Sequence, residues 1–274
     1  MLYFVKLGGS LITDKARAYT ARQDIIVRLA HEVRRSLEIR PRLRLLIGHG
    51  SGSFGHWAAE PYGTREGVST LAQWRGYAEV AAAAARLNRL VTDAFLEVGV
   101  PVLSIRPSAS ARCRDGDVVH LDVRPIGAAL SHRLVPMVHG DVALDDVRGG
   151  TIASTEDLFV YLAGELNPDR ILLLSNVPGV LGPGGKLISH ITPADLPHLR
   201  AILSGAEGVD VTGGMADKVE RMVNLVRRQP QMTVDIVTGT QPGLLMGCLL
   251  GDECDVGTRI YCGDSDCSRD SRPH

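Results

Sequence analysis

Short apolar runs alternate with longer amphipathic segments over most of the 274 residues, and this alternation constrains the fold more than any other feature. Residues 2–7 form an apolar run that ends in two glycines. In residues 23–40, apolar side chains then recur at the spacing of one helix face. Repeated strand–helix pairs predict an α/β protein, a three-layer αβα sandwich around a largely parallel sheet. Ligands bind such sheets beyond the carboxyl ends of the strands.

The same reasoning assigns the other elements of the chain. Strands are predicted at 2–7, 43–47, 102–105, 135–138, 171–174 and 234–237, and helices at 23–40, 74–98, 156–166 and 215–228. A boundary between two lobes is expected at residues 167–169, which follow a helix and precede a strand. The predicted parts are an N-terminal lobe at 1–166, a C-terminal lobe at 167–262 and a polar tail at 263–274.

Charge and cysteine content narrow the class of partner. The chain has 30 Lys and Arg against 31 Asp and Glu, so it lacks the basic excess of a general nucleic-acid binder. It has no apolar run of membrane-spanning length, so a membrane partner is not expected. The five cysteines are an odd, scattered set, which predicts no disulfide framework and a reduced, cytoplasmic setting.

The first glycine turn lies at residues 6–10, with the sequence KLGGS. Glycine allows the backbone to approach an anion closely, and exposed N–H groups in such a turn bind phosphate oxygens. Lys6 places a positive charge beside the turn, and Lys15 follows shortly after. An ordinary strand-to-helix turn with a surface lysine fits the local pattern equally well.

The second glycine turn is richer, with the sequence GHGSGSFGH at residues 48–56. By letter it contains the dinucleotide-binding pattern of Gly50, Gly52 and Gly55. It does not follow the first strand, however, and it lacks the acidic residue expected about twenty positions later. An anion site followed by His56 explains the segment better, because the ring can donate a hydrogen bond to a phosphate. The alternative is a structural histidine.

A third glycine turn, DVTGGMADK at residues 210–218, opens a predicted helix. Lys218 is expected in the first turn of that helix, where a cation opposes the helix dipole. A bound anion would account for this placement, and a solvated lysine is the alternative. The chain carries neither the glycine–lysine phosphate loop of the common ATPases nor the signature set of protein kinases. A kinase with this sequence would therefore follow a different design.

With these motifs the sequence resembles the amino-acid kinase superfamily, and within it the isopentenyl phosphate kinases. The matching segments are 6–15, 50–56, 136–142, 210–215 and 257–260, and together they span about the whole chain. The SFGH ending of the second segment is the most discriminating, because most of the superfamily lacks that histidine. The resemblance implies ATP-dependent conversion of isopentenyl phosphate to isopentenyl diphosphate, a step of an alternative mevalonate route to isoprenoids.

The resemblance also implies that the N-terminal lobe at 1–166 binds the acceptor phosphate and that the C-terminal lobe at 167–262 binds the nucleotide. It implies site residues as well. On the ATP side these are Lys6, Gly8, Gly9, Ser10, Ser51, Asn176, Gly214 and Lys218, and on the acceptor side Gly50, Gly55, His56 and Thr155. The implied catalytic residues are Lys6, Lys15, His56, Glu156 and Lys218, with Lys15 stabilising the transferring phosphoryl group. ATP would bring Mg²⁺ with it, no side-chain metal site is expected, and the implied assembly is a homodimer.

Two departures from the family pattern concern the nucleotide side. The chain has Ser154, Thr155 and Glu156 where the family usually has Ser-Gly-Asp, so a glutamate with one more methylene must orient the lysines. It has Asn176 and Pro178 where the family commonly has two aspartates. Because of these differences, a non-catalytic protein that binds a nucleotide or an oxyanion remains an alternative interpretation.

The apolar tail of the acceptor needs a pocket, and Tyr77 and Val80 on the predicted helix 74–98 are expected to line it. Plain core packing is the alternative interpretation of this helix face. A kinase of the same fold that acts on a fosfomycin-type phosphonate or an acylated amino acid also remains open. An acceptor phosphate is largely a dianion at neutral pH, so the chemistry needs positioning and positive charge rather than a general base.

Overall fold

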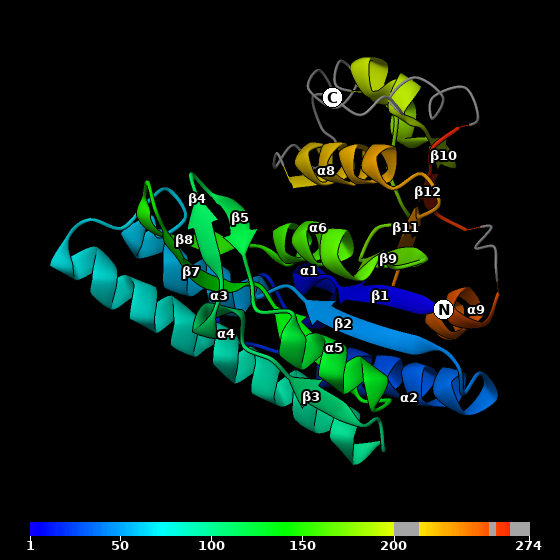
Figure 1. Ribbon diagram of the computed structural model, residues 1–274, viewed down its shortest axis with the longest axis horizontal. Coiled ribbons are helices and arrows are strands. Elements are labelled where there is room, and N and C mark those ends of the chain that lie inside the picture. The colour runs from blue at the N-terminus through cyan, green and yellow to red at the C-terminus, as the bar shows by residue number, and fades with distance from the viewer. Residues whose placement is uncertain (200–213, 252–255, 264–274) are drawn as a thin grey trace.

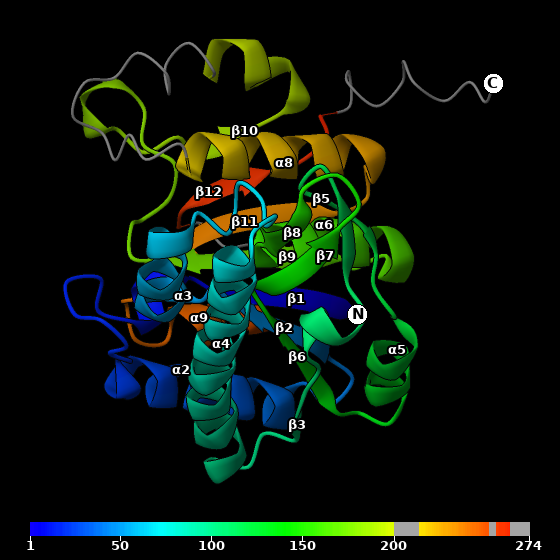
Figure 2. The same cartoon turned by 90° about the vertical axis from the view of Figure 1, so that its left-hand side faces the viewer.

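The computed structural model describes residues 1–199, 214–251 and 256–263. Its centre is an eight-stranded sheet in the order β10-β12-β11-β9-β1-β2-β6-β3, which Figure 2 shows from β12 near the top to β3 near the bottom. The bounds are Leu2–Leu7 (β1), Arg44–His49 (β2), Val102–Ser104 (β3), Val135–His139 (β6), Arg170–Ser175 (β9), His190–Ile191 (β10), Thr233–Thr238 (β11) and Thr258–Ile260 (β12). Among these pairs, only β11 and β12 run antiparallel, so the prediction of a largely parallel sheet is confirmed.

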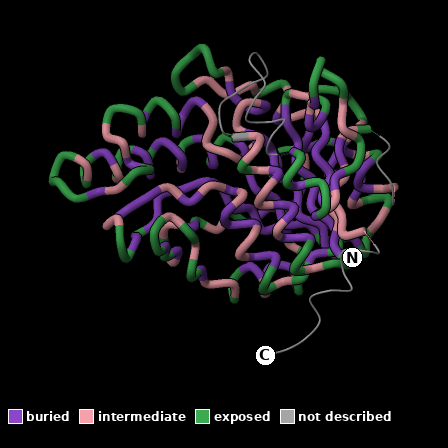
Figure 3. The backbone as a smooth tube through the Cα atoms, turned by 90° about the horizontal axis from the view of Figure 1, so that it is seen from above, coloured by how far each residue is buried: buried purple, intermediate pink, exposed green. Residues whose placement is uncertain are grey.

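Helices cover both faces of this sheet (Figure 1). One face packs against Gly9–Ile12 (α1), Gln23–Ile39 (α2), Gly52–Ala59 (α3), Leu71–Glu97 (α4) and Leu244–Leu250 (α9). The other packs against Arg124–Ser131 (α5), Thr155–Leu166 (α6) and Gly214–Arg228 (α8). Alternate residues of β1 enter the two cores: Tyr3 and Val5 one, Leu2 and Phe4 the other. The predicted three-layer αβα sandwich is therefore confirmed, and the tube in Figure 3 is purple where the buried strands cross its centre.

Side-chain caps explain where two of the helices begin. At α4, the Thr70 hydroxyl accepts from the Gln73 N–H while the Gln73 side chain accepts from the Thr70 N–H, so the helix starts three residues before the prediction. At α6, Ser154 and Asp157 form the same reciprocal pair, and the helix starts at Thr155 rather than at 156.

A second sheet, which the sequence did not predict, lies between α4 and α6 and has the order β5-β4-β7-β8. Its strands are Arg112–Arg114 (β4), Asp117–His120 (β5), Asp141–Asp145 (β7) and Gly149–Ala153 (β8). Only Gly140 separates β7 from β6, and its N–H donates to the His49 carbonyl at 3.0 Å. The small sheet therefore starts beside the C-terminal end of β2. Four short 3₁₀ helices also lie in the described residues, at Glu60–Tyr62, Pro107–Ala109, Pro183–Gly185 and Pro193–Asp195.

The predicted division into lobes stays a prediction. Its boundary at residues 166/167 falls in the connection from α6 to β9, and the large sheet continues across it because β9 pairs with β1. The segment 210–213 of the third glycine turn and residues 264–274 of the predicted tail lie outside the described residues.

The cysteines differ from the expected reduced set. Cys248 and Cys262 are disulfide-bonded, whereas Cys113 is a buried free thiol. The expectation of a fully reduced chain is therefore wrong for these two residues. In the part of the chain that the structure describes, no helix combines the length and apolar character needed to cross a bilayer.

Candidate active site

The first two glycine turns, residues 8–10 and 50–52, lie against each other because they end the neighbouring parallel strands β1 and β2. A Cβ atom on Gly9 would lie 2.6 Å from the Gly52 nitrogen, and one on Gly50 would lie 2.9 Å from the Gly9 nitrogen. This approach therefore requires residues without side chains. The Thr13 hydroxyl links the segments, since it donates to the Gly9 carbonyl at 2.7 Å and accepts from the Ser53 N–H at 2.9 Å.

Four backbone N–H groups of these turns have no hydrogen-bond partner within the described residues, namely those of Gly9, Ser10, Ser51 and Gly52. Their neighbours are paired, as the Gly8 N–H donates to Leu174 and the Gly50 N–H donates to Leu7. Successive unpaired N–H groups at the end of a parallel sheet form an anion-binding surface. The geometry thus supports the phosphate-binding interpretation of both turns.

A buried charged cluster lies beside the turns and joins three elements. Lys6 on β1 forms a hydrogen bond and ion pair with Glu156 at the start of α6. The Lys218 Nζ on α8 lies 3.6 Å from the same Glu156 Oε1. The exposed fractions of these side chains are 8% for Lys6, 14% for Glu156 and 20% for Lys218. The structure therefore brings together three of the five predicted catalytic residues.

The protonation states of this cluster follow from its surroundings. Burial raises the pKa of Glu156, but Lys6 and then Lys218 lower it more, to about 2, so the carboxylate stays ionised. Burial and the charge of Lys6 hold the pKa of Lys218 below its ordinary value despite Glu156. Lys15, exposed in the loop after α1, lowers it slightly further. Two lysines around one carboxylate leave the cluster with a positive excess that an anion can use.

The remaining predicted residues of the nucleotide side lie at the ends of neighbouring elements. The Ser10 hydroxyl lies 3.4 Å from the Asn176 Oδ1, which places the residue after β9 next to the first turn. Gly214 is the first residue of α8, so Lys218 is the fifth residue of the helix rather than part of its first turn.

The second turn continues into a helix that the sequence did not predict. Residues 52–59 form α3, and His56 is an exposed residue on it. Gly55 leaves room for the Ser51 hydroxyl, because a Cβ atom there would lie 2.1 Å from that oxygen. The start of α3 lies directly beside the first glycine turn, since a Cβ atom on Gly52 would lie 2.7 Å from the Gly9 carbonyl oxygen.

Of the two residues predicted to line a tail pocket, Val80 is a core residue and Tyr77 is half-buried. The Tyr77 ring packs near β8, where a Cβ atom on Gly150 would lie 3.0 Å from it. Burial, followed by the charge of Asp141, raises the pKa of Tyr77 to about 12. Thr155 is buried, and its hydroxyl donates to the His49 carbonyl at 2.6 Å.

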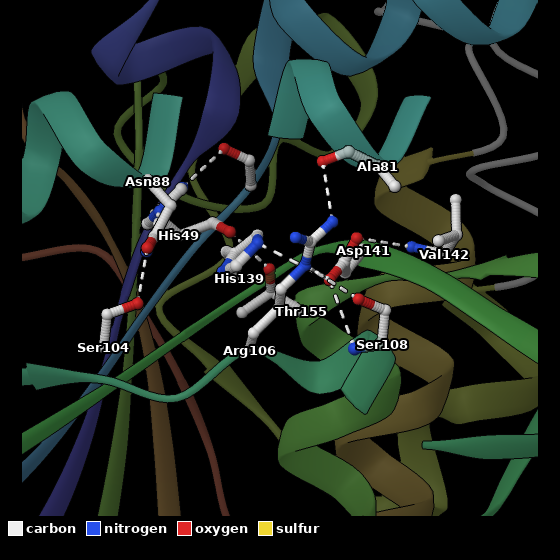
Figure 4. A network of polar contacts seen from close by, with 11 residues as sticks. His49, Ala81, Asn88, Ser104, Arg106, Ser108, His139, Asp141, Val142 and Thr155 are labelled. Atoms are coloured by element: carbon white, nitrogen blue, oxygen red, sulfur yellow. Dashed lines mark hydrogen bonds and ion pairs between the residues drawn. The ribbon is translucent and has the colours of Figure 1, made fainter. Parts of the chain in front are cut away.

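Sequence reasoning missed a buried polar network beneath the second turn, shown in Figure 4. On one side, the Asn88 side chain lies between His49 and Ser104. On the other, Asp141 accepts from the Ser108 N–H at 3.2 Å and pairs with the Arg106 Nε at 3.4 Å. The His139 ring stacks on His49 with 5.4 Å between ring centres and lies 3.7 Å from Asp141.

One signal in the sequence could have revealed this network. Asn88 is a polar residue between Leu87 and Val91 on the apolar face of the long helix, and a buried amide requires partners. The partners themselves come from β2 and β3, so no spacing in the sequence identifies them.

Comparison with known proteins identifies the family. The chain matches the amino acid kinase family over residues 1–237. The protein belongs to this family. It is 32% identical over 258 residues to an isopentenyl phosphate kinase of Methanocaldococcus jannaschii, with 92% of this chain and 96% of that protein covered. It is 38% identical over 251 residues to one of Haloferax volcanii, covering 89% of this chain and 98% of the relative.

Solved structures agree with these sequence relatives. A crystal structure of an isopentenyl phosphate kinase superposes with a TM-score of 0.80 at 30% identity, covering 95% of this chain and 100% of the other. The predicted resemblance to the amino-acid kinase superfamily and to isopentenyl phosphate kinases is therefore confirmed. As a member of the amino acid kinase family, the protein is a small-molecule kinase.

Proposed function

We propose that this amino acid kinase transfers the γ-phosphoryl group of ATP to isopentenyl phosphate and forms isopentenyl diphosphate, a step of isoprenoid biosynthesis. The observation that carries the proposal is the contact of two glycine turns, with four unpartnered N–H groups, beside the Lys6–Glu156–Lys218 cluster. Two adjacent anion sites suit a reaction in which both substrates carry phosphate. The relatives that align over most of this chain are isopentenyl phosphate kinases, which supports this acceptor.

The mechanism follows from charge. The acceptor phosphate, with a second pKa near 6, is already a nucleophilic dianion at neutral pH, so proton abstraction is not the problem. Repulsion between two anions is the problem, and the proposed cations Lys6, Lys15 and Lys218 offset it while charge spreads over the transferring group. The N–H groups of both turns hold the phosphates in place, which converts an encounter into an aligned reaction.

The site residues divide between the two substrates in this proposal. The proposed ATP contacts are Lys6, Gly8, Gly9, Ser10, Ser51, Asn176, Gly214 and Lys218, and the proposed acceptor contacts are Gly50, Gly55 and His56. The proposed ATP contacts therefore come from both predicted lobes. Because the Thr155 hydroxyl is already donated to the His49 carbonyl, we assign Thr155 to supporting the turn rather than to binding the acceptor.

In this proposal, Glu156 takes the place of the family aspartate. Its longer side chain reaches the Nζ atoms of both Lys6 and Lys218, and the ion pairs keep it ionised. In this proposal Glu156 orients the two lysines and does not touch the substrates. Tyr77 and Val80 are proposed to border the apolar tail of the acceptor. The half-buried Tyr77 would contact the tail directly, and the buried Val80 would support it from the core.

Mg²⁺ is proposed to enter with ATP, because this ion keeps several waters and binds largely through substrate phosphates. The described residues contain no group of three or more His, Cys, Asp or Glu side chains arranged for a metal ion. The homodimer and the cytoplasmic location stay predictions. A homodimer is the commonest assembly of soluble oligomers, which is its support here.

An acceptor panel tests the proposed function. Purified protein with ATP and Mg²⁺ is assayed for ADP release with isopentenyl phosphate, dimethylallyl phosphate, fosfomycin and N-acetylglutamate. We expect the highest kcat/KM with isopentenyl phosphate. A higher kcat/KM with fosfomycin or N-acetylglutamate would show that isopentenyl phosphate is not the preferred acceptor. No ADP release with any of the four would favour a protein that binds nucleotides or oxyanions without catalysis.

A further inference from the structure

The direction of the Gly50–Ser51 peptide decides whether the Ser51 N–H can face a phosphate. The peptide is trans, since no cis bond is present in the described chain. In a trans peptide the N–H points opposite to the preceding carbonyl. Whatever holds the Gly50 carbonyl therefore also sets the direction of the unpartnered Ser51 N–H.

The group that holds this carbonyl is the preceding side chain. The His49 Nδ1 lies 3.1 Å from the Gly50 oxygen, and because a carbonyl only accepts, Nδ1 must carry the hydrogen. The neutral ring then has a bare Nε2, which accepts from the Asn88 Nδ2 at 3.1 Å. The Asn88 Oδ1 in turn accepts from the Ser104 hydroxyl, so each donor in the chain faces an acceptor (Figure 4).

The opposite orientation of the Asn88 amide is incompatible with the hydrogen bond between the His49 ring and the Gly50 carbonyl. Its oxygen would face the His49 Nε2, which would then have to carry the hydrogen. The bare Nδ1 would then point its lone pair at the Gly50 carbonyl oxygen. Only the orientation with Nδ2 toward the ring satisfies both ends of the chain.

Burial keeps the ring in this state. His49 and Asn88 are buried, and His139 stacks on the His49 ring with an angle of 11° between the planes. Burial, and next the neighbouring His139, lowers the pKa of His49 to about 3, so the ring is neutral at physiological pH. The ring therefore carries one hydrogen, and Asn88 decides which nitrogen holds it.

We infer that His49, Asn88 and Ser104 are positioning residues that fix the Gly50–Ser51 peptide with its N–H toward the phosphate site. Asn88 lies on α4 and Ser104 on β3, so these hydrogen bonds connect the second glycine turn to two other elements of the fold. The inference rests on the proposed function, because it refines the role of the same turn. It adds residues that touch neither substrate but set a donor that does.

The test compares Asn88→Leu, which removes both bonds of the amide, with Thr92→Val as the matched control. Thr92 lies one turn later on α4 and is buried. Its hydroxyl donates to the Met137 sulfur at 3.6 Å and takes no part in the hydrogen bonds that link His49, Asn88 and Ser104. We expect Asn88→Leu to lower kcat/KM for ATP about ten- to a hundred-fold. Thr92→Val should stay close to wild type. Ser104→Ala removes the last hydrogen bond of the series and should lower kcat/KM for ATP by a smaller factor. This variant replaces Asn88→Leu in the test if Asn88→Leu does not fold.

Two readouts are independent of turnover. The ring ¹⁵N shifts of His49 should show the Nδ1–H tautomer in wild type and its loss in Asn88→Leu. The Ser51 amide signal should shift when a non-hydrolysable ATP analogue binds wild type, and shift less in Asn88→Leu. An Nε2–H tautomer in wild type, or equal kinetics and amide shifts for Asn88→Leu and Thr92→Val, would overturn the inference. If wild type fails on isopentenyl phosphate, the proposed function falls, while these readouts still decide the inference.

Discussion

Glu156 shows how much a single residue of the site depends on its partners. Its carboxylate is buried, which raises its pKa, and Lys6 and then Lys218 are the main groups that keep it ionised. The sequence placed Glu156 in the site through a family motif and left open whether it could replace an aspartate. In the structure its carboxylate contacts Lys6 and Lys218, which lie 150 and 62 positions away in the sequence. Such distances depend on the tertiary fold, so no local pattern predicts them.

At low pH this ion pair should make a measurable contribution to stability. The folded pKa of about 2 lies below the ordinary 4.5, so Glu156 stabilises the fold fully above pH 4.5 and progressively less as the pH falls toward 2. Between pH 5 and pH 3, wild type should lose about 2 kcal/mol more unfolding free energy than Glu156→Gln. Urea unfolding of both proteins over this range measures the difference. Parallel stability curves would show that the ion pair contributes nothing.

His56 is a second single residue with a large expected effect, because its ring is proposed to bind the phosphate of isopentenyl phosphate. We expect His56→Ala to raise the KM for isopentenyl phosphate roughly ten- to a hundred-fold or to abolish turnover, since a charge-assisted hydrogen bond is lost. Binding of an ATP analogue, measured by calorimetry, should be unchanged. The control is His31→Ala, an exposed histidine on α2. Wild-type kinetics in His56→Ala would remove His56 from the site.

At the scale of elements, prediction worked where periodicity is long. The apolar spacing in α2 and α4 is clear over many turns, and both helices were predicted to within a few residues. Helix α3 was missed because Gly52 and Gly55 are poor helix formers and its segment has the composition of a loop. The strands β4 and β5 are only three and four residues long, so alternation cannot identify them.

Gly52 is the residue on which α3 depends. It has a φ of +50°, and a Cβ atom there would lie 2.2 Å from the Thr13 hydroxyl that links the two turns. Gly52→Ala should therefore lower the free energy of unfolding by at least about 1–2 kcal/mol. Gly164→Ala, in the exposed interior of α6 with no atom near the new methyl, should raise it by about 0.5–1 kcal/mol. Urea unfolding distinguishes them, and equal effects would contradict the close approach of the turns.

At the scale of the whole molecule, strand order explains why the site lies where it does. β1 has β2 on one side and β9 on the other, all parallel, so the chain leaves their C-terminal ends at one point of the sheet. Alternating strands and helices predicted this class of fold but not the order of the strands. The order depends on which elements pack together in three dimensions, and spacing along the sequence does not encode it.

If the two turns serve separate ligands, those ligands should stabilise the molecule independently. At one hundred times its Kd, each ligand adds about 2.7 kcal/mol, which raises Tm roughly 5–10 °C for a chain of this size. A non-hydrolysable ATP analogue and isopentenyl phosphate should each raise Tm, and together they should raise it further. Thermal unfolding with each ligand and with both measures this. A combined shift no larger than the larger single one would indicate one shared site.

In the proposed reaction the acceptor atom is a phosphate oxygen of isopentenyl phosphate. The most direct test is ³¹P NMR of the wild-type protein with ATP, Mg²⁺ and isopentenyl phosphate, with isopentenol as the acceptor in a parallel sample. We expect ADP and a new pair of coupled phosphorus signals from isopentenyl diphosphate in the first sample, and no phosphorylated product in the second. Inorganic phosphate as the only new product besides ADP, or phosphorylation of isopentenol, would contradict it.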